Sequence, residues 1–508
     1  MLLNRRQVAL GLGAVPLLTR GVRAQRQPGV LRFGLSSFPP SLQPWQSAGT
    51  AAATVKLMIF RGLVSYDTKG ALRPELAESW ERSGETGWTF KLRDNALFHN
   101  GEKVTSADVK WTLEQVIDER STAFLRAELQ GIQRIETPDA RTVTIVMEQP
   151  TATLPQWLAN YHMPVIYRDS PRSGPIGAGP FRITAQERGT SIDLVPFDRF
   201  YRPGLPKLKG LRIVVYSDEN LRVAALQAGD VDLIEYVPWQ SFDAIQADPR
   251  LKMDATDGPF MYLTFNASKG PFSDARVRRA VAHAVKRDDI VKAAFFGRGS
   301  PLEGTPISPA SEFYNADLAH GWNYDPARAK ALLAEAGVPE GFECALLSTA
   351  QYGMHKDTAE VVQASLAAVG IRANLVLPDW ATRIAQGTRG QYDMGIMGSA
   401  ADSNDPDGLS SYINGSLQPS YNRSFGLPTP RIAELLAAGR AEFDFAKRKA
   451  IYREMEQAVL DIVPMASLAW RSQAYAMTKA VDGFVNLPGA LTYFSGLSLE
   501  QTSIGDAT

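Results

Sequence analysis

The stretch from Phe265 to Val291, FNASKGPFSDARVRRAVAHAVKRDDIV, constrains the fold more than any other part of the chain. A short β-rich run ends at Phe265, and residues 269–271 predict a turn, because glycine tolerates positive φ and proline fixes φ. Ser273 or Asp274 is a suitable N-cap for a helix. Apolar residues then recur at the spacing of one helical face: Val277, Ala280, Val281, Ala284 and Val285. The stretch therefore predicts a strand, a turn and a helix.

Strands and helices alternate along the rest of the chain. Residues 211–216 predict a strand, residues 219–228 a helix, and residues 229–234 a turn into another strand. This alternation is typical of α/β proteins. The 508 residues exceed what one hydrophobic core usually holds. We therefore expect an α/β protein of two or three domains.

Composition excludes several classes of protein. The apolar content of 44% and the charged content of 21% are ordinary for a soluble globular protein. Residues 1–24 hold four arginines and no acid, so the remainder has a net charge of −4, which does not suggest a nucleic-acid binder. The single cysteine, Cys344, cannot form an internal disulfide, and its setting FECALLS predicts a buried strand.

The N-terminus predicts an export signal. Arg5 and Arg6 precede an apolar run over residues 8–18 that is too short to span a bilayer, and residues 22–24 resemble a cleavage site. The paired arginines resemble a twin-arginine signal, and an ordinary secretory signal is the alternative. We expect residues 1–24 to be a signal peptide and the mature protein to be periplasmic.

Motifs of catalysis and metal binding are missing from the sequence. The histidines have spacings that suit no metal site: His99, His162, His283, His320 and His355. There is no G-x-x-x-x-G-K-[ST], G-x-S-x-G or H-E-x-x-H. The glycines of GAGPF at 177–181 lack the Lys-Ser/Thr of a phosphate loop, so we expect them to form a tight turn. These absences favour a binding protein over an enzyme, and no cofactor or metal is expected.

The sequence of residues 265–291 also matches a family-specific pattern. The pattern N-x4-P-F-x-D-x-R-V-R-R-A-x-x-x-A resembles the signature of the family 5 extracellular solute-binding proteins, the dipeptide/oligopeptide-binding receptors of ABC importers. Six further blocks resemble that family in the same order: IFRGLVSYD at 59–67, LRPELAESWE at 72–81, FHNGEKVTSADVKWTL at 98–113, GAGPFRI at 177–183, YDPARAKALLAEAG at 324–337 and DSNDPDG at 402–408. The resemblance covers nearly the whole mature chain.

The resemblance implies a two-lobed periplasmic binding protein of class II, the Venus-flytrap type, with an extra subdomain inserted in the first lobe. The boundaries that we expect follow from the blocks and from the alternation of elements. Lobe I is expected to comprise residues 25–49, 177–262 and 478–508, the inserted subdomain residues 50–176, and lobe II residues 263–477.

A ligand site is expected where the strand at 392–397 ends in the acidic loop DSNDPDG, because pockets favour domain interfaces and the carboxyl ends of strands. The resemblance implies that Asp402 accepts the α-ammonium of a peptide ligand. A solvated acidic loop is one alternative. A Ca²⁺ loop is another, although Pro406 and the missing downstream Glu argue against it.

This chain differs from its relatives at two positions, and both differences argue against a free dipeptide as the solute. Dipeptide-specific relatives place an arginine just before the helix that we expect near Asp357, and this chain has only Lys356 there, a poor substitute for a bidentate guanidinium. Many relatives carry a tryptophan where this chain has Ser399. Longer peptides, glycosides, opine-like conjugates and metal chelates therefore remain open as solutes.

Aromatic side chains beside loops and strand ends are candidate walls of the same site. Those that we expect to contact the solute are Phe38, Trp45, Tyr262, Trp380 and Trp470. Trp470 is favoured, because it follows the strand that is expected to cross between the lobes, and Trp380 is the least favoured. Packing on a neighbouring domain is the alternative for Phe38 and Trp45.

The sequence as a whole favours a periplasmic receptor that binds a peptide or peptide-like solute and delivers it to an ABC permease. A non-peptide solute on the same scaffold is the first alternative, and a periplasmic hydrolase or chaperone-like protein is an alternative of another class. The expected partners are the solute and the membrane-spanning subunits of the permease, without nucleic acid, and the protein is expected to be a monomer.

Overall fold

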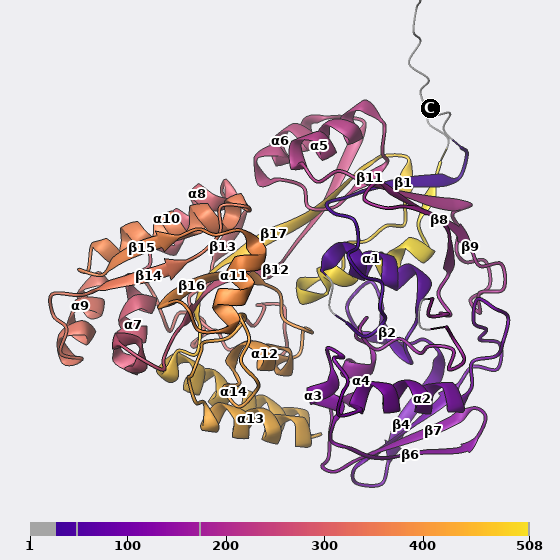
Figure 1. The fold of residues 1–508 in the computed structure, drawn as a ribbon, viewed down its shortest axis with the longest axis horizontal. Coiled ribbons are helices and arrows are strands. Elements are labelled where there is room, and N and C mark those ends of the chain that lie inside the picture. The colour runs from indigo at the N-terminus through magenta and orange to yellow at the C-terminus, as the bar shows by residue number, and fades with distance from the viewer. Residues whose placement is uncertain (1–26, 47–48, 172–173, 506–508) are drawn as a thin grey trace, which may run out of the picture.

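The computed structural model describes residues 27–46, 49–171 and 174–505, so the predicted export signal lies outside the described residues. Figure 1 shows two lobes side by side, connected by the long strands β12 (Leu251–Phe265) and β17 (Ala466–Thr478). This two-lobed α/β architecture confirms the predicted fold class.

One mixed sheet runs through both lobes in the order β15-β14-β16-β12-β17-β11-β1-β10-β9-β8, with β13 (Gly299–Pro301) paired to β17. In that order the bounds of the ten strands are Arg372–Val376, Glu343–Leu347, Met394–Ser399, Leu251–Phe265, Ala466–Thr478, Leu233–Ile234, Val30–Leu35, Gly210–Val215, Ser191–Pro196 and Phe181–Glu187. The central pair, β12 and β17, therefore belongs to both lobes.

The antiparallel register of β12 with β17 shifts at two places, between Asp257 and Phe260 and between Met261 and Tyr262. The register runs to Asp257 and resumes at Phe260, so Gly258 and Pro259 stand in a bulge. Bulges bend a strand, and proline removes a ladder donor. A Cβ on Gly258 would lie 2.0 Å from the carbonyl oxygen of Gly489, so the close approach requires glycine. The bulge marks the hinge between the two lobes.

The first lobe has three hydrophobic cores, of which the third is formed by residues between 223 and 251 with Ala474 and Ala476. On the large sheet, α1 (Thr50–Ile59) packs with β1 and with the 3₁₀ segment η4 (Gly489–Glu500). A second, antiparallel sheet has the order β4-β5-β7-β6, and α2 covers it. Its elements are β4 (Ala77–Ser83), β5 (Gly87–Leu92), β6 (Ile132–Asp139), β7 (Thr142–Met147) and α2 (Ser106–Ile117). The lobe also contains β2 (Val64–Tyr66), β3 (Leu72–Pro74), α3 (Arg126–Leu129), α4 (Leu154–Leu158), α5 (Glu219–Ala228), α6 (Phe242–Ala247), β18 (Val481–Asp482) and β19 (Ser503–Ile504).

Helix α1 bears on the predicted domain boundaries. The boundary at residue 50 assigns α1 to the inserted subdomain, whereas Val55 and Met58 of α1 are buried in the core of the large sheet. The small sheet at 77–147 has a core of its own. We therefore propose that the subdomain begins after α1, and the other boundaries stay predictions.

The second lobe packs helices on the strands at the other end of the large sheet. They are α7 (Ala275–Ala284), α8 (Arg287–Phe295), α9 (Pro326–Glu335), α10 (Gly353–Ala367), α11 (Trp380–Thr388), α12 (Ser410–Ile413), α13 (Pro430–Ala441) and α14 (Phe445–Ile462). Cys344 is buried on β14, as predicted. The carboxylate of Asp274 caps α7 by accepting from the backbone N–H of Arg276 at 2.8 Å, and four of the five predicted apolar positions of this face lie within the helix.

Arg278 explains part of the signature stretch. Its side chain is buried, although the apolar stripe alone placed it outside the core. The guanidinium donates to the carbonyl oxygens of Phe272, Ser273, Ile462 and Val463. This arginine therefore ties the turn before α7 to the end of α14, which is a structural role.

The GAGPF segment corrects one expectation. A Cβ on Gly177 would lie 2.2 Å from the carbonyl oxygen of Ile59, and one on Gly179 would lie 2.3 Å from that of Met58. The glycines let this segment run against the end of α1, and they do not form the tight turn that we expected. His99 is held here, with Nε2 2.9 Å from the carbonyl oxygen of Gly179, and burial lowers its pKa to about 4.

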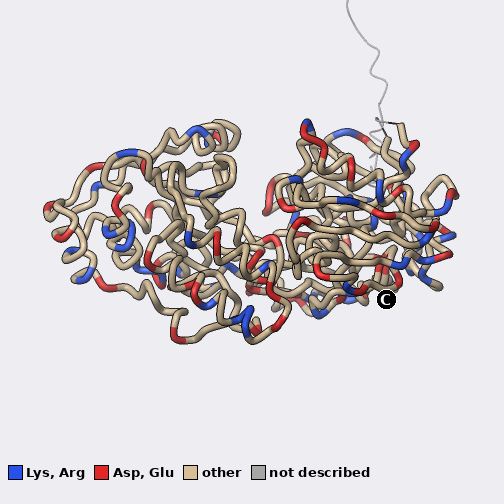
Figure 2. The backbone as a smooth tube through the Cα atoms, turned by 90° about the horizontal axis from the view of Figure 1, so that it is seen from below, with Lys and Arg blue, Asp and Glu red and all other residues tan. Residues whose placement is uncertain are grey.

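Charge is mixed over the whole surface. Figure 2 shows Lys and Arg interspersed with Asp and Glu on both lobes. Within residues 27–46, 49–171 and 174–505, no helix is long and apolar enough to cross a membrane. Over the same ranges, no three His, Cys, Asp or Glu side chains gather in a way that could hold a metal ion.

Candidate functional site

The acidic loop, residues 402–408, lies where the second lobe meets the first. It follows β16, and its Asn404 contacts the first lobe: the side-chain amide donates to the carbonyl oxygen of Pro488 at 3.2 Å, and its oxygen accepts from the backbone N–H of Ala490 at 2.9 Å. Figure 1 places α12, which follows this loop, at the edge of the second lobe nearest the first. The structure thus places the predicted loop at the interlobe seam.

Two of the three aspartates in the acidic loop have structural partners. Asp405 forms a double hydrogen bond with Arg448, at 2.6 and 2.8 Å, and Asp407 accepts from Arg440 Nε at 2.6 Å. Both arginines come from the second lobe, on α14 and α13. These two carboxylates are therefore neutralised within the lobe and hold the loop in place.

Asp402 differs from its neighbours. Its Oδ2 accepts from the hydroxyl of Ser411 at 3.0 Å, and no Lys or Arg in the described part of the chain forms an ion pair with it. Burial, the charge of Glu128 and the charge of Asp407 raise its pKa to about 7, against the smaller effect of Ser411. A carboxylate with a raised pKa gains most from a positive partner.

Glu128 brings a second carboxyl group to the seam from α3 of the first lobe. Burial raises its pKa, and its buried Oε2 has no hydrogen-bond partner among the described residues. Asp402 and Glu128 therefore raise the local negative potential from opposite lobes. A cationic group between them would relieve the repulsion.

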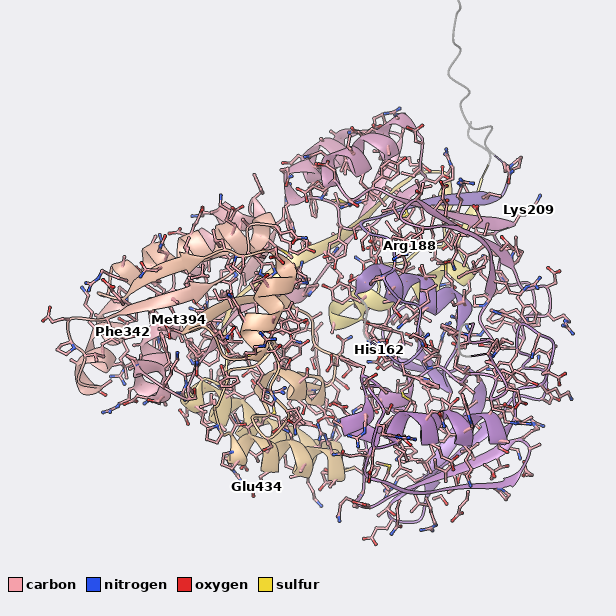
Figure 3. The ribbon with its side chains drawn as sticks, in the orientation of Figure 1. His162, Arg188, Lys209, Phe342, Met394 and Glu434 are labelled. Carbon is pink, nitrogen blue, oxygen red and sulfur yellow. The ribbon has the colours of Figure 1, made fainter. Side chains whose placement is uncertain are left out.

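Phenolic side chains from both lobes surround Asp402. Tyr412 of α12 donates to the carbonyl oxygen of Ala400 at 2.7 Å, and burial and the charge of Asp402 raise its pKa. Tyr161 of the first lobe is partly buried, and its pKa is raised first by desolvation and then by Asp402 and Tyr493. Figure 3 shows His162, the neighbour of Tyr161, on the side of the first lobe toward the second, and Met394 of β16 within the second lobe.

Two of the predicted aromatic contacts, Trp470 and Tyr262, belong to the same aromatic cluster as Tyr412. Trp470 is 9% exposed and meets Phe260 edge to face at 5.8 Å. Tyr262 is fully buried, meets Tyr412 edge to face at 5.8 Å and donates to the carbonyl oxygen of Asn422 at 2.9 Å. Tyr262 thus packs against Tyr412. Because Tyr262 is fully buried, it could not contact a solute directly in this conformation.

The other predicted aromatics lie elsewhere. Trp380 begins α11 and contacts His355 at 5.6 Å and Tyr352 at 5.3 Å. Trp45 donates from its indole nitrogen to the carbonyl oxygen of Pro164 at 3.2 Å. Phe38 and Trp45 pack against the core of the large sheet in the first lobe. Packing thus accounts for both of these side chains.

Arg471 is a site residue that the sequence analysis did not select. It follows Trp470 on β17 at the hinge and is 2% exposed. Its Nη2 donates to the hydroxyl of Tyr493 of the first lobe at 3.0 Å, and Tyr493 stacks on Tyr236 at 6.5 Å. A charged residue inside the apolar run MASLAW…AYAM is the sequence signal that could have found it.

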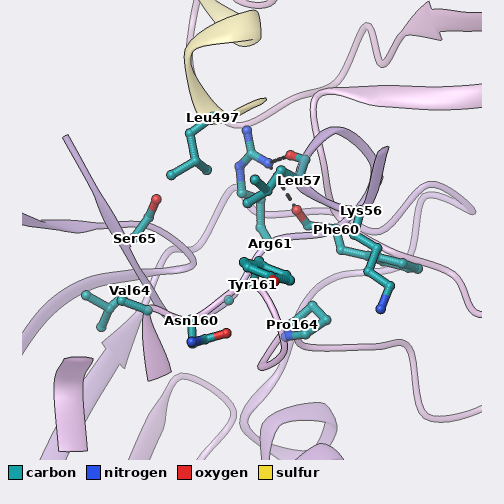
Figure 4. A pocket seen from close by; sticks show the side chains of 12 residues that line it. Lys56, Leu57, Phe60, Arg61, Val64, Ser65, Asn160, Tyr161, Pro164 and Leu497 are labelled. Atoms are coloured by element: carbon teal, nitrogen blue, oxygen red, sulfur yellow. Dashed lines mark hydrogen bonds between the residues drawn. The ribbon is translucent and has the colours of Figure 1, made fainter. Parts of the chain in front are cut away.

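Two cavities in the described part of the chain lie away from the acidic loop. A cavity of about 20 Å³, drawn in Figure 4, lies between α1 and residues 159–164 of the first lobe, with Lys56 and Arg61 in its wall. This volume is about that of one water molecule. An open groove of about 570 Å³ lies between α8 and α10 on the second lobe. Neither cavity is lined by residues of the acidic loop.

The position that holds an arginine in dipeptide-specific relatives is occupied differently here. Helix α10 begins at Gly353, one turn earlier than predicted, so Lys356 lies within it. Its ammonium is 3.4 Å from Glu360, one turn further along the same helix. Lys356 therefore has a carboxylate partner within α10.

Comparison with known proteins agrees with the fold and with the sequence blocks. The family model of the bacterial extracellular solute-binding proteins, family 5 middle region, matches residues 71–420. The glutathione-binding protein GsiB of Pectobacterium atrosepticum is 26% identical over 480 residues, which is 91% of this chain and 92% of that protein.

Solved structures extend the comparison over nearly the whole chain. The periplasmic binding protein AgaA of A. tumefaciens R10, in complex with agropinic acid, is 42% identical with a TM-score of 0.87, covering 94% of this chain and 99% of that one. The binding protein DppA of Helicobacter pylori, in complex with the peptide STSA, has a TM-score of 0.82 at 22% identity, covering 94% and 98%.

Proposed function

The chain belongs to the family 5 bacterial extracellular solute-binding proteins, and from this premise we propose that its solute is an amine-bearing, peptide-like molecule held by Asp402 between the lobes. Members of the family are periplasmic binding proteins of ABC importers, and that function is this chain's as well. The relatives are solute-binding proteins and not enzymes, which supports a receptor without turnover.

The observation that carries the proposal is the contrast within the acidic loop. Asp405 and Asp407 have arginine partners, whereas Asp402 has only the hydroxyl of Ser411. An ammonium group at Asp402 would form a charge-assisted hydrogen bond, worth about 1.5–3 kcal/mol. Glu128 from the first lobe adds to the attraction once the lobes are together.

The solute need not be a free dipeptide. The carboxylate of a dipeptide would find Lys356 already paired with Glu360 at the position of the relatives' arginine. The names of the relatives include a glutathione-binding protein and a receptor in complex with agropinic acid, which supports conjugates derived from amino acids. An opine-like conjugate without a free ammonium is the second candidate, favoured by the 42% identity to AgaA.

The proposal also covers the export route, the oligomeric state and the membrane partner. We propose that residues 1–24 direct export, by the twin-arginine route if the pair Arg5-Arg6 acts as such a signal. We propose that the mature protein acts as a monomer in the periplasm and passes its solute to the membrane-spanning subunits of an ABC permease. Neither a cofactor nor nucleic acid has a role in this proposal.

The charge of Asp402 can be removed with little change of shape. Titration calorimetry would compare Asp402→Asn with wild type, using the solute released from the purified protein and its N-acetylated form. We expect Asp402→Asn to weaken binding of the free amine by tenfold or more, about 1.4 kcal/mol. The N-acetylated form should bind wild type weakly and lose little more on substitution.

A matched control is Asp198→Asn, which removes the same charge from an exposed site on the first lobe. It should bind as wild type does. Equal affinity of wild type and Asp402→Asn for the free amine would contradict the amine-bearing solute and favour the opine-like alternative, with the receptor function unaffected.

A further inference from the structure

Arg471 is a buried cation at the hinge that lacks an anionic partner. No Asp or Glu in the described part of the chain forms an ion pair with it. Its Nη2 donates to Tyr493, its Nη1 lies 3.3 Å from the sulfur of Met354, and its buried Nε has no acceptor among the described residues. A neutral hydroxyl and a thioether compensate a desolvated guanidinium poorly.

A second buried arginine without an anionic partner among the described residues, Arg383, lies in the second lobe. Arg383 of α11 is 1% exposed, and the ring of Trp380 lies 4.7 Å from its guanidinium carbon. Its Nη2 contacts the carbonyl oxygen of Ile396, while Nε and Nη1 have no hydrogen-bond partner among the described residues. As for Arg471, no carboxylate of the described chain pairs with it.

His355 connects the two arginines. It is buried next to Met354 on α10, its ring lies 5.6 Å from that of Trp380, and its Nδ1 has no partner among the described residues. Burial, Arg383 and Arg471 together hold its pKa well below the usual range, so His355 is neutral. Arg383 and Arg471 therefore lie within electrostatic reach of one imidazole and give this side of the seam a positive potential.

Leaving buried guanidinium N–H groups without an acceptor is unfavourable, so such groups in proteins are usually hydrogen-bonded. Other buried arginines of this chain follow that rule: Arg222 and Arg278 direct their N–H groups to main-chain carbonyl oxygens. Arg383 and Arg471 instead direct unpaired N–H groups toward atoms that are not acidic. The missing partner is an anion that this chain does not supply.

We propose that Arg471, together with the hydroxyl of Tyr493, forms an anion subsite at the hinge that binds a carboxylate of the solute, and that Arg383 adds positive potential to it. The inference rests on the proposed function for the solute's place between the lobes. It adds that the solute carries an acid group, held opposite the ammonium at Asp402.

The two subsites are linked through the first lobe. Tyr161 is close enough to both Asp402 and Tyr493 for each to raise its pKa, after burial itself. Tyr161 thus lies near both Asp402 and Tyr493, and the hydroxyl of Tyr493 accepts from Arg471 at 3.0 Å. A solute with an amine at one end and a carboxylate at the other matches this arrangement of charges.

The test compares acids with their amides. Agropinic acid, glutathione and the peptide STSA would each be titrated against wild type as the free acid and as the primary carboxamide. We expect at least one of the acids to bind, and to bind at least tenfold more tightly than its amide. Arg471→Gln should bring the acid and the amide within twofold of each other, because the charge that distinguishes them is gone.

Two further variants keep the result interpretable if Arg471→Gln folds poorly. Tyr493→Phe removes one hydroxyl with little change of volume and should reduce the preference for the acid by two- to fivefold. Arg372→Gln removes an exposed arginine of the same lobe and should leave the preference unchanged.

The outcomes separate this inference from the proposed function. Asp402→Asn should weaken the acid and the amide equally, so the preference for the acid survives. A lost preference in Arg471→Gln beside an ineffective Asp402→Asn keeps the anion subsite and overturns the ammonium site. If no acid binds wild type, if acid and amide bind equally, or if Arg471→Gln and Tyr493→Phe both retain the full preference, the anion subsite is overturned.

Discussion

At the scale of single residues, the three aspartates of the acidic loop look alike in the sequence but have different surroundings in the structure. Asp405 and Asp407 hold the loop to α13 and α14 through arginines of the same lobe. Asp402 does not contribute to that framework, and its carboxyl lies among Glu128, Asp407, Ser411, Tyr161 and Tyr412. The ionised form of Asp402 is therefore available to a ligand and unfavourable without one.

The stability of the ligand-free protein should reveal this property. The pKa of Asp402 is about 7 in the folded protein against 3.8 for the free side chain, so between these pH values the folded state holds a proton that the unfolded state has lost. Asp402 therefore lowers the free energy of unfolding as the pH rises from about 4 through 7, and the penalty stays at higher pH. Asn has no such penalty.

We accordingly expect Asp402→Asn to raise the melting temperature of the ligand-free protein at pH 8 and to leave it nearly unchanged at pH 4. Thermal unfolding of protein freed of solute by dialysis from denaturant measures this, with Asp198→Asn as the control. A lower melting temperature of Asp402→Asn at pH 8 would mean that the ionised carboxylate stabilises the fold.

At the scale of elements, the sequence predicts those helices and strands whose pattern is local. The helix at 219–228 has the predicted bounds, because the carboxylate of Asp218 caps its start and Gly229, in the left-handed region, ends it. The first half of β12, LKMDATD, alternates apolar and polar residues, which is a local strand signal. Its pairing with β17, over 200 residues further along the chain, could not be predicted from that pattern.

In the candidate site, too, some residues could be predicted from the sequence and others could not. Asp402 could be found because the whole D-x-x-D-P-D block resembles the family. Glu128, Tyr161, Arg471 and Tyr493 come from four other segments, and only the packing of the lobes brings them to the seam. Phe38 and Trp45 show the converse, because an aromatic residue in a loop has the same sequence signal whether it contacts a ligand or a neighbouring core.

At the scale of the whole molecule, the lobes also touch between the end of α13 and the small sheet of the first lobe. Phe443, between α13 and α14, meets Trp88 of the small sheet at 6.1 Å, and the guanidinium carbon of Arg82 lies 3.6 Å from its ring. The backbone N–H of Ala152 donates to the carbonyl oxygen of Arg440 at 2.6 Å. Since Arg440 also holds Asp407, this contact joins the first lobe to the acidic loop.

These contacts should favour the closed arrangement, because opening about the hinge breaks them. We expect Phe443→Ala to increase the radius of gyration of the ligand-free protein in X-ray scattering, by shifting the lobes toward an open form. Phe445→Ala is the control, because Phe445 contacts Phe313 of its own lobe at 5.2 Å. An unchanged radius in Phe443→Ala would show that this contact does not hold the lobes together.

We expect a solute carrying both an amine and a carboxylate to bind between the lobes. Mass spectrometry of the small molecule released by denaturing the purified protein would identify these groups, with samples taken before and after acetylation of amines and amidation of carboxylates. We expect one released species whose mass shifts with both reagents. A released species that reacts with neither reagent would rule out a solute of this kind.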